Sequence, residues 1–370
     1  MPTYKNMKKR YYYIDFLRIF SMFAVVFLHS ASDLLRTEYN TGLWHFSNVL
    51  TSLFSVSVPI FFMISGAMLL SDEKASSIKG LYKVRLKKIV LPFLFWSLFA
   101  VIYFLITEYL YYDTLNFSAL KYRVMLFLSE PVTIHLWFMY ALIPIYVILP
   151  FLKVLIDNIN NKQSIYLFLI WAIFSIFTTT AQNFLPGEYK ALFSFNYSFN
   201  LNVIGGYVGF FILGYYLHKI DFKLKRKYLI IFIVADVFIV SFGTYILYIL
   251  KNGYFENFKV YTGLFTVSLS IAVFLLFKDI FKNKENVKFS KLINKLSETS
   301  FGIYLIHNLV INFFNLNYFI QPEQGIIFLI LRFIMVYLIS FLIIYVLTLL
   351  KPLSFITSGI KHRGRINEKN

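Results

Sequence analysis

The sequence contains no cysteine and little charge. The absence of cysteine excludes disulfide bonds, a thiolate nucleophile and thiolate metal sites. Charged residues make up only 15% of the chain, whereas hydrophobic residues make up 59% and the mean hydropathy is +0.67. A soluble core would leave much of this apolar surface uncovered. The composition therefore indicates a protein whose solvent is the lipid bilayer.

The sequence also lacks a long polar stretch in which a soluble domain could fold. Apolar segments long enough to cross the hydrocarbon core of a bilayer begin near the N-terminus and recur up to residue 350. We therefore expect an all-α, polytopic integral membrane protein with one membrane-embedded domain over residues 1–370. Its core is expected at about 11–350, with short tails at 1–10 and 351–370.

Ten apolar segments are expected to form transmembrane helices. Segment 203–217 is the shortest and carries four glycines, which suits close helix packing or a broken helix. Without this segment the count would be nine. The expected segments are 12–33, 47–70, 89–109, 134–152, 164–181, 203–217, 228–250, 260–277, 300–319 and 326–350.

Lysine and arginine are distributed unevenly between these segments. The two tails and every second loop carry 28 of the 36 basic residues, the intervening loops carry 6, and Arg18 and Arg332 lie inside segments. Basic loops stay on the cytoplasmic side of a membrane, so both termini are expected in the cytoplasm. This distribution explains the net charge of +18 without a nucleic acid partner, because the basic residues do not form one continuous soluble face.

Ionisable side chains inside the apolar segments are few, and such groups usually face a partner or a cavity. In the first segment, Arg18 and His29 are eleven residues apart, close to three helical turns, so they project from one face together with Asp15. Roughly 16 Å separates Arg18 from His29 along the helix axis, which requires different partners or roles. The other intramembrane groups are His135, His307 and Arg332.

His29 is the leading candidate for a catalytic group. A neutral imidazole accepts a hydroxyl proton near neutral pH, so His29 could activate a sugar hydroxyl toward a thioester, or carry the acyl group itself. A structural alternative fits equally well: an ion pair between Asp15 and Arg18 at the inner surface and an interfacial His29. The histidines show no paired metal-ligand spacing, so no metal is expected.

Two further segments have an unusual composition. The second apolar segment ends in Ser65-Gly66, which permits close helix packing. The loop expected just before the third segment, within 83–92, carries four basic residues within six positions. Such a cluster suits either contact with anionic lipid or a phosphate site.

Four ordered motifs stand out along the chain. The first is Tyr13-Ile-Asp-Phe-Leu-Arg18 followed by His29, and the others are Val56-Ser-Val-Pro-Ile-Phe-Phe-Met-Ile-Ser-Gly66, His135-Leu-Trp-Phe-Met-Tyr140 and Ser300-Phe-Gly-Ile-Tyr-Leu-Ile-His307. Together they resemble the acyltransferase family 3 of membrane proteins, in particular its short members that O-acetylate surface polysaccharides such as enterobacterial common antigen. The first motif is the most specific, because it fits the family's Arg-x10-His signature.

This resemblance implies ten core helices in the inner (cytoplasmic) cell membrane and no tightly bound cofactor. It implies cytoplasmic acyl-CoA, expected to be acetyl-CoA, as co-substrate and a hydroxyl of an envelope glycan or its lipid-linked precursor as acceptor. The implied catalytic residues are His29, its companion Arg18, and Asp15. The implied donor-binding residues are Arg85, Lys88, Ser65 and His307, and the implied acceptor-binding residues are His135, Trp137 and Arg332.

The resemblance is incomplete at one position. Many family members carry Arg-x-x-Arg before the third helix, whereas this chain has Arg85 and Lys88, and lysine keeps the charge but loses bidentate phosphate geometry.

The expected depths also predict two clusters, with Asp15, Arg18 and His307 in the inner half and His29, His135 and Arg332 in the outer half. An extended pantetheine arm would link the two clusters.

Two other function classes fit a polar membrane cavity. A polysaccharide exporter of the same fold would need neither acyl-CoA nor His29, and a sensor or scaffold would tolerate changes at both Arg18 and His29. The sequence names no acceptor sugar, hydroxyl position, acyl chain or oligomeric state, because those depend on pocket shape and surface contacts.

Overall fold

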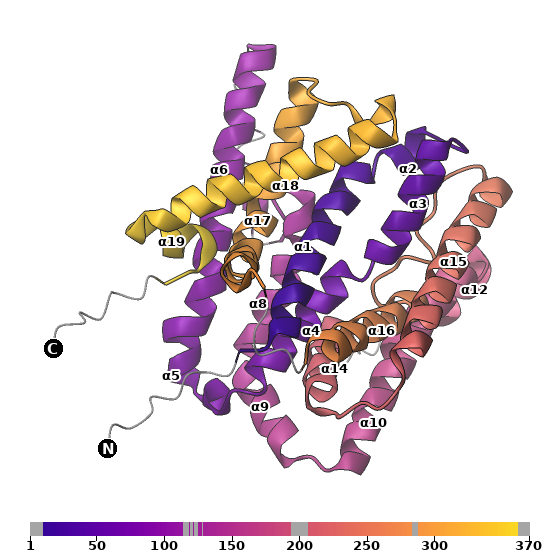
Figure 1. Ribbon diagram of the computed structural model, residues 1–370, viewed down its shortest axis with the longest axis vertical. Helices are drawn as coiled ribbons and strands as arrows, with labels where there is room; N and C mark the ends of the chain where they lie inside the picture. The colour runs from indigo at the N-terminus through magenta and orange to yellow at the C-terminus, as the bar shows by residue number, and fades with distance from the viewer. Residues whose placement is uncertain are drawn as a thin grey trace.

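The computed structural model is a bundle of helices (Figure 1). It describes residues 10–113, 118, 121, 125–127, 129–193, 206–282 and 288–361. Helices account for all the regular structure in these residues, which contain no β-strand. The expected all-α class is therefore confirmed for the described part of the chain.

Seven helical segments of the described residues are long and apolar enough to cross a membrane. Several of them join shorter helices end to end. They are α1–α2 (Tyr12–Ala31, Leu34–Thr37), α3–α4 (Gly42–Phe54, Ser57–Leu69), α5–η2–α6 (Ile78–Gly80, Leu81–Leu86, Lys87–Tyr112), α10–η4–α11 (Asn161–Trp171, Ala172–Phe177, Thr178–Phe184), α15 (Arg226–Lys251), α16 (Leu264–Phe281) and α18 (Ile326–Leu349).

An eighth span is formed if a bent pair of helices is counted as one. Residues Ile134–Val147, comprising η3 (Ile134–Leu136) and α8 (Trp137–Val147), meet α9 (Leu149–Asn158) at 58°. The remaining described helices are α14 (Tyr207–Lys219), α17 (Ser290–Leu316), α19 (Lys351–Ser358) and the short η1 (Glu73–Ser76), α12 (Gly187–Lys190), η5 (Ala191–Phe193) and η7 (Pro322–Gln324).

The expected count of ten spans is not confirmed, although each expected segment overlaps a helix. α14 has only 13 residues, and residues 203–205 of the expected segment 203–217 lie outside the described part of the chain. α17 is long enough, but it is not among the seven apolar spans because polar side chains lower its hydropathy. It begins at Ser290, ten residues before the expected segment 300–319.

The basic residues within 83–92 also differ from expectation. They were expected in a loop, but the chain is helical from Ile78 to Tyr112, with one π-helical stretch, η2. Arg85 and Lys88 therefore project from a rigid element. π-Helical turns are frequent at functional sites because the extra residue changes the direction in which side chains point.

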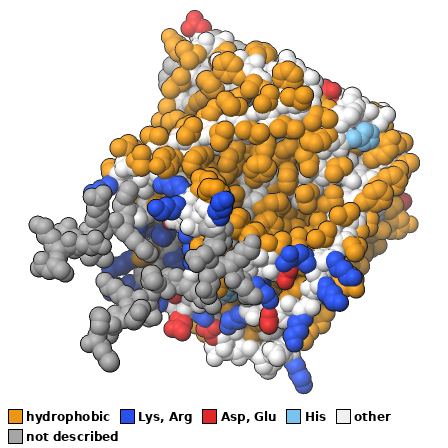
Figure 2. Space-filling view, in the orientation of Figure 1, with side chains coloured by type: hydrophobic (Ala, Val, Ile, Leu, Met, Phe, Trp, Pro, Cys, Tyr) orange, Lys and Arg blue, Asp and Glu red, His pale blue; other side chains and the backbone are white. Residues whose placement is uncertain are grey.

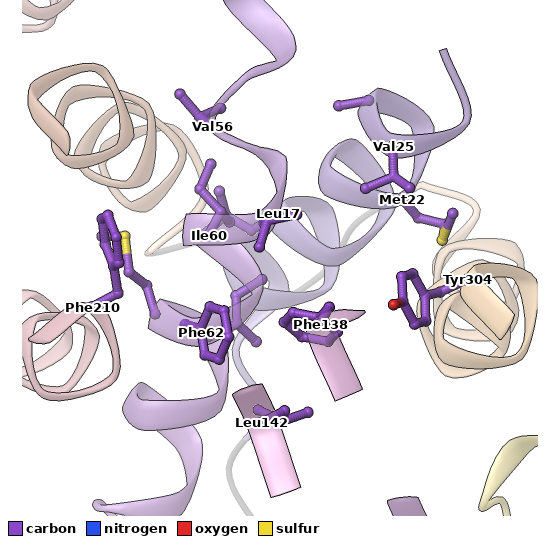
Figure 3. Packing of buried hydrophobic residues seen from close by; sticks show 14 of the residues in the cluster. Leu17, Met22, Val25, Val56, Ile60, Phe62, Phe138, Leu142, Phe210 and Tyr304 are labelled. Carbon is purple, nitrogen blue, oxygen red and sulfur yellow. The ribbon is translucent and has the colours of Figure 1, made fainter. Parts of the chain in front are cut away.

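α1 lies at the centre of the bundle and packs against α17, α4, α3, α16 and α18. The core around it is closely filled by side chains such as Leu17, Met22, Ile60 and Phe62, all fully buried (Figure 3). By contrast, α6, α15 and α18 expose many large apolar side chains. Figure 2 shows a broad hydrophobic band on one face with Lys and Arg gathered below it, as expected for a protein surrounded by lipid.

The two ends of the described chain lie on the same side of the bundle. Arg10 forms an ion pair with Asp15 at the start of α1, and Gly359, just after α19, packs against the backbone of Lys88 at the start of α6. Lys88 belongs to one of the basic segments. Both described ends therefore lie beside basic segments, and the assignment of this side to the cytoplasm stays a prediction.

The most extensive helix pair, α4 and α14, depends on glycine. A Cβ atom at Gly66 would overlap the carbonyl oxygen of Phe211, and one at Gly214 would overlap the carbonyl of Met63. The two backbones are therefore in direct contact, as in other membrane helix pairs with small interfacial residues. The close packing expected at Ser65-Gly66 is confirmed.

Gly66→Ala is predicted to destabilise the protein. The added methyl group meets backbone rather than a flexible side chain, so α4 and α14 must separate, at a cost of roughly 1–3 kcal/mol or more. Gly42→Ala is the matched control, because nothing lies within 4 Å of a Cβ at that position. Thermal unfolding in detergent should show a lower transition temperature for the Gly66 variant only; equal transitions would contradict the close contact.

Candidate functional site

A cavity of about 700 Å³ lies within the bundle at the side where the described chain begins and ends. Residues of α1, α4, α6, α8, α17, η1 and η2, together with the end of α19, surround it. Its polar and charged lining residues are Arg18, Ser65, Asp72, Lys74, Arg85, Lys88, Tyr146, Ser297, Glu298, Ser300, Tyr304 and Ser358. Four predicted site residues, Arg18, Ser65, Arg85 and Lys88, thus share one cavity.

One side of this cavity is basic and reaches the protein surface. Lys74 and Lys88 are exposed there, and Arg85 is half-buried between them and the interior. Arg85 Nη2 donates to Asp72 Oδ2 at 2.9 Å, which fixes the guanidinium in place. Its Nη1 is buried and has no hydrogen-bond partner among the described residues. A fixed guanidinium with an unused donor is well suited to bind an anionic group.

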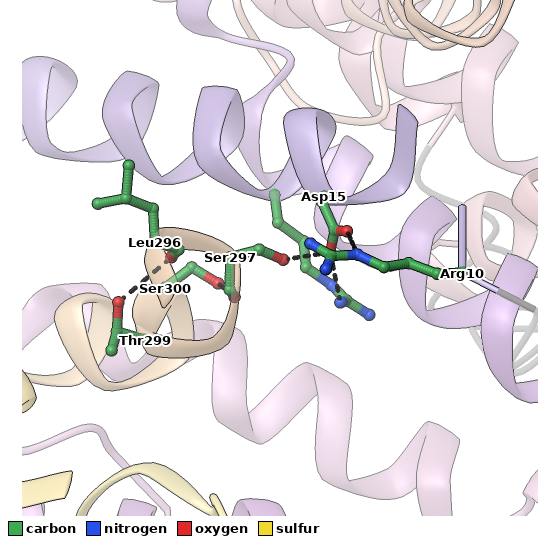
Figure 4. A network of polar contacts seen from close by, with 7 residues as sticks. Arg10, Asp15, Leu296, Ser297, Thr299 and Ser300 are labelled. Carbon is green, nitrogen blue, oxygen red and sulfur yellow. Dashed lines mark hydrogen bonds and ion pairs between the residues drawn. The ribbon is translucent and has the colours of Figure 1, made fainter. Parts of the chain in front are cut away.

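A carboxylate on α1 organises the next part of the site (Figure 4). Asp15 is only 7% exposed and accepts a hydrogen bond from Ser297 Oγ of α17 at 2.7 Å. Arg10 Nε donates to its second oxygen at 2.7 Å, and Arg18 Nη1 lies 3.7 Å from Asp15 Oδ1. Asp15 therefore joins α1 to α17 and balances the charge of Arg18, which lines the cavity. The expected i,i+3 pair between Asp15 and Arg18 is confirmed.

The inner end of the cavity is bounded by Tyr304 of α17. Figure 3 shows its ring beside that of Phe138, and the two centroids are 5.3 Å apart. The Tyr304 hydroxyl donates to the backbone carbonyl of His135, and its ring lies 5.5 Å from the His135 ring and 6.0 Å from the His307 ring. Tyr304 is therefore the side chain that contacts both the cavity and the histidines beyond it.

Three histidines from three helices meet beyond Tyr304. The ring centroids of His135 and His307 are 4.8 Å apart, those of His29 and His307 are 5.2 Å apart, and those of His29 and His135 are 6.3 Å apart. His135 and His307 are buried, whereas His29 is half-buried. His29 is therefore the most accessible of the three rings.

Backbone carbonyls orient two of these rings. His307 Nδ1 lies 2.7 Å from the carbonyl oxygen of Tyr304, and His135 Nε2 lies 3.3 Å from that of Leu305. A carbonyl only accepts hydrogen bonds, so each of these nitrogens carries the proton of a neutral imidazole. The other nitrogen of His135 then accepts from the Thr133 hydroxyl at 3.1 Å.

The predicted depth of His307 was wrong. It was expected with Asp15 and Arg18 in the inner half, but it lies with His29 and His135. The reason is the early start of α17, which places His307 at the eighteenth position of the helix rather than in its first turns. His307 is not among the residues that line the cavity.

Trp137 and Arg332 lie outside both groups. The Trp137 ring stacks on Tyr261 with centroids 5.5 Å apart and contacts Tyr207 at 5.4 Å. Arg332 of α18 is buried, and its Nη2 donates to Asn315 Oδ1 of α17, whereas its Nε has no partner among the described residues. The structure brings neither residue into the cavity.

Sequence reasoning missed several residues of the site, among them Tyr304 and Ser297. Tyr304 precedes His307 by three residues and so shares a face with it, a signal present in the Ser300–His307 motif. Ser297 lies between the expected segments 260–277 and 300–319, so no helical spacing pointed to it. The described residues contain no group of three or more His, Cys, Asp or Glu side chains that could hold a metal ion.

Comparison with protein families found a match over most of the chain. The family model of the acyltransferase domain of acyltransferase family 3 matches residues 11–349. No match was found among curated proteins or among solved structures. The matched range includes Asp15, Arg18 and the three clustered histidines, together with Arg85 and Lys88 on the basic side of the cavity.

The contact between Asp15 and Ser297 is predicted to couple the stabilities of α1 and α17. Asp15→Ala and Ser297→Ala should each destabilise the protein, and the double variant should lose less than the sum, by roughly 0.5–3 kcal/mol. Thr299→Ala is the control, because Thr299 Oγ1 bonds the Lys295 carbonyl within its own helix. Unfolding in detergent measures all combinations; additive losses for Asp15 and Ser297 would rule out the coupling.

Proposed function

The chain belongs to acyltransferase family 3 and is a membrane acyltransferase, and on that premise we propose that it transfers an acetyl group from acetyl-CoA to a hydroxyl of a cell-surface polysaccharide or its lipid-linked precursor. One observation carries this proposal: a cavity that is basic where it reaches the surface ends at a tyrosine touching a histidine cluster. An anionic donor with a long arm fits such a shape.

The basic side of the cavity suits the phosphate groups of coenzyme A. Arg85 offers a buried, unused Nη1, and Lys74 and Lys88 add positive charge at the surface. Lysine binds phosphate as a point charge, so Lys88 can replace the second arginine of the family pattern for attraction, although not for bidentate geometry. We assign the donor phosphates to this side.

The apolar lining of the cavity suits the pantetheine arm. Phe61, Ile64, Phe138 and Leu142 line the cavity together with the basic residues and Tyr304. His29 is eleven residues from Arg18 on α1, roughly 16 Å along the axis. An arm that extends past Tyr304 would bring the thioester from the Arg18 level toward His29.

His29 is assigned the role of general base. It removes the proton of the acceptor hydroxyl as the oxygen attacks the thioester carbonyl and forms a tetrahedral intermediate. Collapse of the intermediate breaks the carbon–sulfur bond, and the departing thiolate takes the proton from His29, so the base is restored. A route through an acyl group on His29 itself uses the same side chain and differs in leaving a covalent intermediate.

Acyl transfer from radiolabelled acetyl-CoA into envelope glycan tests this proposal. Membranes containing the wild-type protein should incorporate label, and membranes with His29→Ala at matched expression should not. His45→Ala is the control, because His45 is exposed near the start of α3, bonds Asn40 and does not line the cavity. Two results together would favour an exporter. The wild type would incorporate no label, and glycan export would continue in the His29 variant without acetyl-CoA.

Arg85→Lys is predicted to weaken donor binding while chemistry continues. Lysine keeps the charge facing Asp72 but removes the second guanidinium nitrogen, so KM for acetyl-CoA should rise by roughly 10-fold, the effect of one lost charge-assisted hydrogen bond of about 1.5 kcal/mol. Arg36→Lys, outside the cavity lining, is the control. A fall in kcat with unchanged KM would place Arg85 elsewhere in the mechanism.

A further inference from the structure

His307 combines complete burial with an unused hydrogen-bonding atom. Its side chain is 0% exposed, and its Nε2 has no hydrogen-bond partner among the described residues. A buried polar atom without a partner is costly, and most such atoms in folded proteins are satisfied. Because His307 does not reach the surface, contact with solvent cannot explain a histidine at this position. The explanation must lie in its contacts inside the protein.

The protonation of this atom follows from its ring. Because His307 Nδ1 donates to the Tyr304 carbonyl, Nε2 of the neutral ring carries a lone pair and can only accept. The neighbouring His135 cannot supply the missing donor, since its two nitrogens already pair with the Leu305 carbonyl and the Thr133 hydroxyl. The Nε2 atom of His307 can therefore accept a hydrogen bond only from another side chain.

His29 is positioned to be that side chain. Its ring centroid is 5.2 Å from that of His307 with the planes inclined at 49°. At this separation, ring nitrogens that point at each other would be about 3 Å apart, a hydrogen-bond length. His29 is only half-buried, which leaves its ring room to rotate.

We propose that His307 is a positioning residue for His29: its Nε2 accepts a hydrogen bond from one ring N–H of His29 and so directs the other His29 nitrogen, as the base, toward the acceptor hydroxyl. This inference rests on the proposed acyl transfer. When His29 gains the hydroxyl proton, the same bond stabilises the imidazolium, because its charged N–H groups are stronger donors than neutral ones. His307 gains no proton and touches neither substrate.

Two substitutions separate this role from packing. His307→Asn keeps a donor near the Nδ1 position, toward the Tyr304 carbonyl, but has no atom near Nε2, whereas His307→Gln can place its amide oxygen there as an acceptor. In wild-type protein and both variants in lipid nanodiscs, we measure kcat and KM with acetyl-CoA and the acceptor glycan. For the Asn variant, kcat should fall by about 10²-fold to 10⁴-fold with KM unchanged. The Gln variant should recover most of this loss.

A kcat equal to that of the wild type in the Asn variant would overturn the proposal. Equal losses in the Asn and Gln variants would also overturn it, because His307 would then be the base itself or a packing residue. Ser30→Ala is the control for a loss of thermal stability in the Asn variant. It removes a buried hydrogen bond within α1, from the Ser30 hydroxyl to the Val26 carbonyl.

A second measurement needs no enzymatic activity and keeps the two proposals apart. Solid-state ¹⁵N spectra of histidine-labelled protein should show His307 protonated at Nδ1 and unprotonated at Nε2, with an Nε2 shift that moves when His29 becomes Ala. A protonated Nε2, or a shift that ignores His29, would overturn the role of His307. Failure of wild-type acetyl transfer alone would instead count against the proposed function.

Discussion

The architecture of this protein depends on the contact between α1 and α17. At one end of α1, Asp15 accepts a hydrogen bond from Ser297, and fourteen residues later His29 lies beside His307. Because both pairs advance in the same direction along the chain, the two helices run parallel. The contact places a charged pair at the level of the cavity and imidazole rings beyond it. A lipid-facing helix could not carry these polar groups, since each would cost several kcal/mol in hydrocarbon.

Hydropathy located the helices that are apolar throughout. It placed the start of α17, which carries polar residues of the site, ten residues too late. Segments such as α15 and α18 meet lipid along most of their length, so their boundaries follow from composition. α17 was expected to begin at 300, because Ser297 and Glu298 look like loop residues. These side chains line a cavity, where polar residues are tolerated at membrane depth. The error in the helix start then carried over to the depth of His307.

The same distinction applies to the site residues. Helical periodicity placed Arg18 on the face of its helix that also carries Asp15, and the family pattern pointed to Arg85 and Lys88; Arg18, Arg85 and Lys88 do share the cavity. These sequence patterns did not reveal Tyr304 as the side chain between cavity and histidines, and they grouped Trp137 and Arg332 with the site, which the structure does not. Those relations depend on how α8, α17 and α18 pack, and no local pattern encodes such packing.

The π-helical stretch η2 adds a different kind of constraint. A π-turn accommodates one more residue than an α-turn, so the angular offset between Arg85, inside η2, and Lys88, in α6, is set by the number of residues between fixed ends. Removal of a single residue between 81 and 84 would rotate the preceding chain by about 100° relative to α6 and so turn Asp72, which precedes η2, away from Arg85. The number of residues at this point therefore sets the directions of the basic side chains. Two homologous sequences with the same basic residues but different lengths here would present different charge patterns to the same ligand.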